Sequence, residues 1–213
     1  MYEEETRFLE QNICNLAYAQ YDSDNKWGIP TMLPVSIDNL KDIPLQGFNF
    51  ALTDKNPEGK GVHFFIHDYQ FERIWQRPQR YTDFLRKYSF CLTPTFSTYI
   101  DMPYALQVYN VYRNRWCGRF WQEQGLKVIP AITFGSFEKD LDMYCAGIPK
   151  HSTIAISTMG EGRWANYKGL YSIWDKILEL LEPDTILLYG KDLSANLAGN
   201  IVYKRYVTSK VAL

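Results

Sequence analysis

The sequence predicts an α/β fold, a mostly parallel sheet built from βα units with a barrel-like architecture that is either closed or incomplete. Short apolar or β-branched runs alternate with helical stretches along most of the chain. These runs are continuously apolar, which is typical of strands that are buried on both faces of a parallel sheet. The 213 residues fall short of the roughly 250 that a complete eight-unit barrel usually needs, and an open doubly wound sheet is the alternative.

Six strands are expected, because six apolar runs end in the Gly, Pro, Thr, Ser or Asp residues that interrupt strands. One helix is expected to begin near Pro78, because proline is tolerated in the first turn. Another has a clear apolar stripe that includes Leu170, Trp174 and Leu181. The expected strands cover residues 48–52, 62–69, 90–97, 127–135, 153–160 and 185–191, and further helices cover residues 104–124, 137–146 and 167–182.

The chain is expected to form a single α/β domain over residues 47–213, preceded by a segment of 46 residues. Within that segment, residues 1–21 have near-helical apolar spacing and predict a short N-terminal helix. Turn residues follow, and residues 29–46 contain three prolines. This part is therefore expected to be an irregular connector.

The composition limits the classes of function. Aromatic residues make up 16% of the chain, so the rings either fill an aromatic core or line a pocket. A net charge of −1 excludes a global basic field, although a local basic patch stays open. Four scattered cysteines and three histidines predict no metal site, and no cofactor is expected. Without a leader sequence or a long apolar run, the protein is expected in the cytoplasm and away from membranes.

Polar, small and aromatic residues follow the predicted strands. In parallel α/β folds, ligands bind at the carboxyl ends of the strands. These residues are therefore expected to surround a pocket that is rich in hydroxyl groups. The expected ligand-binding residues are His67, Tyr69, Thr95, Phe96, Ser97, Thr133, Phe134, Ser157, Thr158, Tyr189 and Lys191, and Ser136 and Gly160 stand in the same loops.

Asp68 is the candidate catalytic residue, because a carboxylate at a strand end can act as an acid or base or can bind a sugar hydroxyl. Alternatively it caps the helix that follows. The hydroxyls of residues 93–97 either surround a ligand or form a βα turn in which Ser97 or Thr98 is the cap. Ser157 and Thr158 lie in a small-residue turn that could approach an anion, but no Walker A motif is present.

The predicted helix over residues 104–124 places Asn110 and Arg113 at the edge of an aromatic face. A guanidinium there can stack on a ring while its fork binds a phosphate or a carboxylate. Arg113 and Asn110 are therefore further expected ligand-binding residues, and a structural ion pair for Arg113 is the alternative. Arg115 and Arg119 share another row of the helix and are expected to face solvent.

Several long motifs resemble the DUF4417 family of bacterial and phage proteins. They are GVHFFIHDYQFERIWQRPQRY, LTPTFSTYIDMP, ALQVYNVYRNRWCGRFWQEQGLKVIP, TIAISTMG and ILLYGK, and the resemblance covers about residues 27–206. It implies a phage or mobile-element origin and a place in the cytoplasm of the bacterial host. It implies little about activity, because the family is named for its unknown function.

Two positions depart from the pattern that the resemblance implies. Family motifs more often carry D-D-Y and P-D-F-S, where this chain has His67 and Thr95. A pair of carboxylates across the strand ends would then be absent, and a mechanism that used both would be impaired or altered. The departure favours binding over catalysis, although Asp68 is retained.

Three functions are therefore weighed. The first is a protein that binds a nucleotide-like or phosphorylated small molecule at the strand ends, which could sequester a host signalling nucleotide. The second is an enzyme that acts on a nucleotide, nucleoside or glycosidic bond through Asp68. The third, which the net charge does not favour, is a nucleic-acid-binding accessory protein of phage replication. Its motivation is the mixture of basic and aromatic residues in RYTDFLRKY and YRNRWCGRF.

Overall fold

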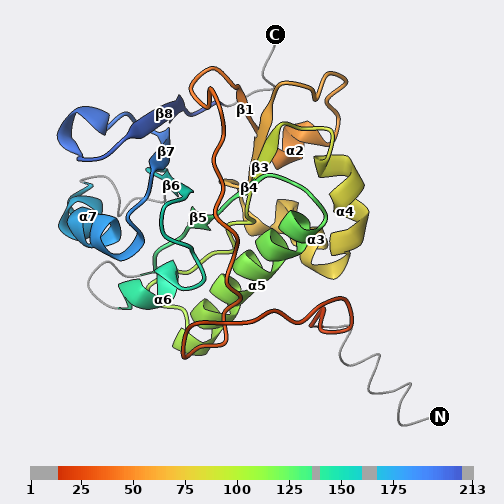
Figure 1. Ribbon diagram of the computed structural model, residues 1–213, viewed down its shortest axis with the longest axis horizontal. Coiled ribbons are helices and arrows are strands. Elements are labelled where there is room, and N and C mark those ends of the chain that lie inside the picture. The colour runs from red at the N-terminus through yellow and green to blue at the C-terminus, as the bar shows by residue number, and fades with distance from the viewer. Residues whose placement is uncertain (1–13, 136–139, 160–166, 208–213) are drawn as a thin grey trace.

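The structure is a computed structural model, and it describes residues 14–135, 140–159 and 167–207. Strands and helices alternate along these residues (Figure 1). The strands are β1 (Leu45–Gly47), β2 (Gly61–His63), β3 (Phe90–Leu92), β4 (Val128–Ile129), β5 (Ala131–Ile132), β6 (Thr153–Ser157), β7 (Thr185–Gly190) and β8 (Ile201–Arg205). The helices are α2 (Phe48–Ala51), α3 (Arg73–Gln76), α4 (Pro78–Leu85), α5 (Tyr104–Glu123), α6 (Leu141–Cys145) and α7 (Lys168–Leu181), with short 3-10 turns η1 (Asp68–Gln70) and η3 (Ser194–Asn196).

All neighbouring strands pair in parallel and form two four-stranded sheets, in the orders β1-β2-β3-β4 and β5-β6-β7-β8. Only Pro130 separates β4 from β5. Proline has no backbone N–H to donate to a ladder, so the sheet is interrupted there. The carbonyl of Pro130 still accepts a hydrogen bond of 2.9 Å from the N–H of Ala155. The prediction of an α/β fold with a mostly parallel sheet is therefore confirmed.

Among the described residues, strand pairing closes no barrel. At one outer edge, the Lys204 ammonium of β8 donates hydrogen bonds to the carbonyls of Lys41 (2.8 Å) and Ile43 (2.7 Å), just before β1. A side chain, and not a ladder of backbone hydrogen bonds, therefore links the two outer strands. The described strands thus form two parallel sheets, an arrangement that fits both an incomplete barrel and the alternative of an open sheet.

Helices cover the two sheets on opposite sides of the molecule, with α7 beside β6 to β8 and with α3 and α4 beside the first sheet (Figure 1). The predicted stripe of α7 is buried, because Leu170, Trp174 and Leu181 pack with the outer side chains of the second sheet. Helix α5 contributes Trp116 and Trp121 to the core of the first sheet and Val111 to that of the second. It therefore lies between the two halves, which decides how its polar residues are used.

Two expectations about the elements were wrong. Residues 48–52 were expected to form a strand, but Phe48 and Ala51 are buried three residues apart in helix α2, which is helical spacing. The strand lies just before, as β1, and its first two residues fall in the segment that was expected to be irregular. Strand β8 was not predicted at all. The predicted N-terminal helix lies mostly outside the described residues, and residues 14–18 form a turn.

None of the helices in the three described ranges is both long and apolar enough to cross a lipid bilayer.

Candidate functional site

The carboxylate of Asp68 links the turn after β2 to the turn after β3 by hydrogen bonds. The carboxylate of Asp68 accepts hydrogen bonds from the N–H of Ser97 (2.8 Å) and from its hydroxyl (2.8 Å). Asp68 does not cap the helical turn that follows it, which was the alternative role, because η1 has no side-chain cap. Hydrogen bonds to a charged acceptor are stronger than neutral ones, so this pair fixes the geometry of two strand ends. Asp68 is half-buried and Ser97 remains partly open to solvent.

The threonine hydroxyls near these strand ends bond to neighbouring chain segments. The buried Thr95 hydroxyl donates to the carbonyl of Phe64, and the Thr93 oxygen accepts from the N–H of Ala131 at 2.8 Å. The Thr133 hydroxyl lies 3.5 Å from the carbonyl of Phe96. These groups therefore hold the strand ends together and are satisfied within the protein. Phe134 is buried and packs edge-on against Tyr144, with ring centroids 6.0 Å apart.

Helix α5 delivers a polar pair to the same place. The Asn110 amide donates to the carbonyl of Ser97 at 2.6 Å, and its oxygen accepts from Arg113 at 2.6 Å. The other end of the Arg113 fork meets the carboxylate of Glu72 at 2.6 Å. Its guanidinium carbon lies 3.8 Å from the ring centroid of Phe96. A continuous network thus runs from Asp68 through α5 to α3, and Arg113 makes the structural ion pair that was its alternative reading.

The expectation that Arg115 faces solvent was wrong. Only 1% of Arg115 is exposed, and its guanidinium donates to the carbonyls of Ala146 (3.0 Å), Tyr144 (2.7 Å) and Ala131 (3.1 Å). The physical reason is that both halves of the molecule cover α5, so the helix has no wet face at this level. Burial lowers the pKa of Arg115 to about 10, which leaves it charged at neutral pH. Arg119 is half-buried and pairs with Glu123 at 2.8 Å.

A second group of predicted residues lies where β6 and β7 end. The Thr158 hydroxyl lies 3.2 Å from the carbonyl of Tyr189, and its oxygen accepts from the N–H of Lys191 at 2.6 Å. The Ser157 oxygen accepts from the N–H of Met159 at 3.0 Å. These hydroxyls therefore shape their own turns. The Lys191 side chain is exposed, with its ammonium 4.8 Å from the ring centroid of Tyr167.

Tyr189 points into the interior of the sheet. Its ring centroid lies 4.4 Å from that of His63 and 5.4 Å from that of Phe65. Burial raises the pKa of Tyr189 to about 12 and lowers the pKa of His63 to about 3, so both side chains are neutral at physiological pH. The stacked rings fill the space between the two sheets at the strand ends.

Large aromatic side chains beside the Asp68–Ser97 pair are left in solvent. Tyr69 is 78% exposed, and its ring lies nearly parallel to that of His67, at 14° with 6.0 Å between centroids. Tyr99 is 56% exposed, and its hydroxyl lies 3.1 Å from the Ser97 hydroxyl. Sequence reasoning missed Tyr99, although it is an aromatic residue two positions beyond a predicted site residue. We call His67, Tyr69 and Tyr99 the aromatic surface.

Two of the predicted loop residues, Ser136 and Gly160, lie outside the described residues. Within the described ranges, no group of three or more His, Cys, Asp or Glu side chains is placed to hold a metal ion.

No solved structure matches this chain. Two curated phage proteins do, each described as a Gene 1 protein. The protein of Mycobacterium phage L5 is 38% identical over 134 residues, which are 62% of this chain and 58% of that protein. The protein of Mycobacterium phage D29 is also 38% identical over 134 residues, which are 62% of this chain and 49% of that protein. The chain thus spans about half the length of these relatives.

The model of the family described as a domain of unknown function, DUF4417, matches residues 21–206. This match includes both sheets and every site residue described above. The chain is therefore a phage-related protein, and it belongs to the DUF4417 family.

Proposed function

We propose that this protein binds a nucleotide-like or phosphorylated small molecule at the carboxyl ends of its strands. The observation that carries the proposal is the aromatic surface. Exposed aromatic rings expose apolar area to water unless a partner covers them, and a base can stack on them. His67 and Tyr69 already lie nearly parallel, as a platform for a planar ligand requires.

Polar groups at the carboxyl ends of the strands supply the contacts that a nucleotide needs. The hydroxyls of Ser97 and Tyr99, 3.1 Å apart, can bond to a sugar or to a base edge. The exposed ammonium of Lys191 at the end of β7 supplies a positive charge for a phosphate. The network behind them, from Asp68 to Arg113, holds the backbone in place. A phage protein of this kind would withhold a nucleotide from its host.

Calorimetry of the full chain against a panel of nucleoside mono-, di- and cyclic phosphates tests the proposal. Tyr69→Ala should weaken binding by about 5- to 150-fold, because base stacking on one aromatic ring contributes on the order of 1–3 kcal/mol. Tyr171→Ala is the matched control, since Tyr171 is a tyrosine on α7 that is 38% exposed. Absence of binding by the wild type, or an equal loss in both variants, contradicts the proposal.

A second candidate function is an enzyme that uses Asp68 as its acid or base. The observation that favours it is the chain of hydrogen bonds from Asp68 through the Ser97 hydroxyl to Tyr99, which reaches solvent. Asp68→Asn keeps one oxygen as an acceptor for Ser97, so the fold should survive. If any nucleotide of the panel is turned over, this variant should abolish the reaction and retain binding. Unchanged turnover removes Asp68 from the mechanism.

A further inference from the structure

The segment of residues 73–87, which contains α3 and α4, is strongly basic in a chain that is close to neutral. It holds five basic residues and one acidic residue, a net charge of +4, whereas the whole chain carries −1. All five basic side chains are exposed: Arg73, Arg77, Arg80, Arg86 and Lys87. We call these five residues, with the exposed Lys127 nearby, the basic surface.

The cations of the basic surface have no anionic partner among the described residues. No carboxylate of the described ranges forms an ion pair with any of them. Arg73 donates to the carbonyl of Gln70 at 3.2 Å, whereas Arg77 and Arg80 make no side-chain hydrogen bond within the described ranges. By contrast, the exposed Lys150 pairs with Glu182 at 2.5 Å. The basic surface therefore keeps its charge available for an external anion.

The aromatic residues of RYTDFLRKY, residues 80–88, are turned toward the core. Tyr81 and Tyr88 are buried, and Phe84 is half-buried against Phe48, with ring centroids 6.0 Å apart. RYTDFLRKY was expected to present basic and aromatic groups together, so that bases of a single strand could stack on the rings. The structure does not place these rings on the surface in that way. The rings of this segment pack inward, and the cations of this segment point outward.

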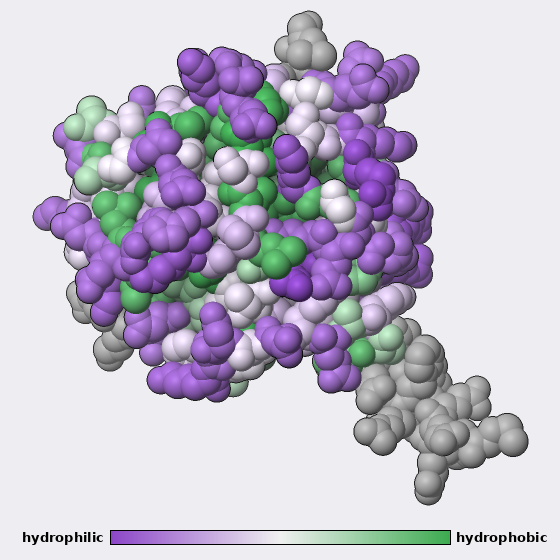
Figure 2. Space-filling view, in the orientation of Figure 1, coloured by the Kyte–Doolittle hydropathy of each residue, from purple (hydrophilic) through white to green (hydrophobic). Residues whose placement is uncertain are grey.

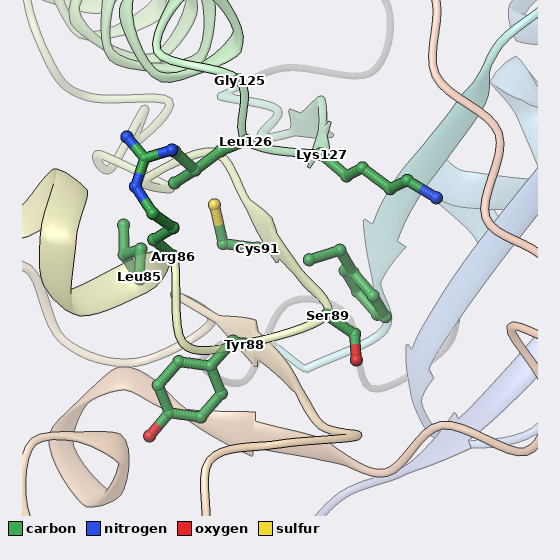
Figure 3. A pocket seen from close by; sticks show the side chains of 9 residues that line it. Leu85, Arg86, Tyr88, Ser89, Cys91, Gly125, Leu126 and Lys127 are labelled. Carbon is green, nitrogen blue, oxygen red and sulfur yellow. The ribbon is translucent and has the colours of Figure 1, made fainter.

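The basic surface continues from α4 to the start of β3 and β4. Arg86 and Lys127 line a hollow of about 230 Å³ between the end of α4 and the turn after α5, and Figure 3 shows them on opposite sides of it. Figure 2, in the orientation of Figure 1, shows hydrophilic side chains over the edge where α4 lies. Arg86 and Lys127 lie at the amino ends of the strands, opposite to the aromatic surface, whereas Arg73 lies at the carboxyl ends, where it bonds to Gln70 next to Tyr69.

We propose that the basic surface binds the phosphate backbone of double-stranded DNA without reading its sequence. Guanidinium forks match phosphate oxygens, and several such contacts spaced along a surface give binding that depends on charge alone. A lipid surface fits less well, because no large apolar side chain between residues 70 and 98 is exposed to enter it. The proposal does not depend on the small-molecule site, because none of the cations of the basic surface is among the residues proposed for that site.

Fluorescence anisotropy tests it with the full chain and a labelled 30-base-pair duplex of arbitrary sequence, across a series of salt concentrations. The first variant is Arg77→Gln with Arg80→Gln, which removes two exposed charges without touching the core. The matched control is Lys168→Gln with Lys176→Gln, which removes two exposed charges from α7 on the other side of the molecule. Circular dichroism and thermal unfolding of all three proteins verify their folding.

We expect the Arg77/Arg80 variant to bind the duplex about tenfold more weakly at low salt. The slope of log affinity against log salt should become shallower by about 2, because each lost phosphate contact removes about 0.9. The control should keep the slope of the wild type. If the first variant does not fold, Arg86→Gln with Lys87→Gln replaces it, with the same expected result.

Four results would overturn the proposal. The first is that the wild type does not bind the duplex at low salt, and the second is that the first variant binds it as tightly as the wild type. The third is that the α7 control loses as much affinity as the first variant. The fourth is that the protein clearly prefers a single strand of the same length. The last result would assign binding to stacking, which the buried rings of α4 cannot supply. Binding of anionic vesicles without binding of the duplex would assign the surface to a membrane instead.

Discussion

Two arginines of α5, Arg113 and Arg115, lie two residues apart and serve opposite halves of the molecule. Arg113 faces the loops of the first sheet, where Glu72 and Asn110 accept hydrogen bonds from its two terminal nitrogens and Phe96 lies against it. Arg115 faces the second sheet and α6, and within the described residues its partners are Asn114 and carbonyl oxygens. Neither arginine is left without polar partners.

The comparison shows that one residue type performs different tasks according to what covers it. Arg113 has a carboxylate partner whose side chain is 40% exposed, so the pair lies at the margin between core and solvent. Arg115 is fully buried and joins α5 to β5 and to the loop after α6. The partly exposed Arg113 pair can adjust when a ligand binds. The buried hydrogen bonds of Arg115 can only hold the fold together.

Replacing Arg115 should have the largest effect. Arg115→Met fills a similar volume but removes the side-chain donor of the buried carbonyls of Ala146 and Tyr144, while Ala131 keeps Asn114 as a donor. Each unpaired buried group is costly. We expect the free energy of unfolding to fall by about 3–5 kcal/mol, measured by urea denaturation. A loss below about 1 kcal/mol would show that Arg115 is not a structural connection and would break the comparison.

Acid should destabilise the interior through His63. Its pKa is about 3 in the folded protein because of burial, against 6.5 in the unfolded chain, so the unfolded chain binds more protons between these values. Stability should therefore fall as the pH is lowered from 6.5, by up to about 1.4 kcal/mol per pH unit. Urea denaturation at pH 7, 6 and 5 measures this slope.

His63→Leu should flatten that slope, because it removes the buried group that must stay neutral. His67→Gln is the control, since His67 is exposed at the same end of the sheet. Equal slopes for the wild type and His63→Leu would mean that other groups dominate the response to acid. The pH dependence of stability would then not distinguish the buried interior from the exposed margin.

Replacing Arg113 or its partner should have the smallest effects. Arg113→Met should lower the free energy of unfolding by about 1–2 kcal/mol, because Asn110 and Glu72 lose a donor at the edge of the core. Glu72→Gln should cost less than about 1 kcal/mol, because the Glu72 side chain is 40% exposed and solvent screens the pair. Thermal and urea unfolding of both variants measure these losses of stability. If Glu72→Gln lowered the free energy of unfolding as much as Arg115→Met does, the two arginines would not differ in their structural roles.

The candidate site was only partly predictable, for reasons visible in particular residues. The rule that ligands bind at strand carboxyl ends led to Asp68 and Ser97, which do meet. It also led to Tyr189, whose ring turned out to point inward, because a strand period does not tell which face becomes the interior. Tyr99 was missed because its exposure depends on the path of the loop after β3.

By itself, the sequence determined the alternation of strands and helices, the parallel pairing and the buried stripe of α7, because hydrophobic periodicity is a local property of the chain. Only the tertiary structure decided that Phe48 begins a helix, that β8 joins the second sheet and that Arg115 is buried. The physical reason is that burial depends on what packs against a residue from distant parts of the chain. The spacing within a helix tells which side chains share a face, but not whether that face meets water or protein.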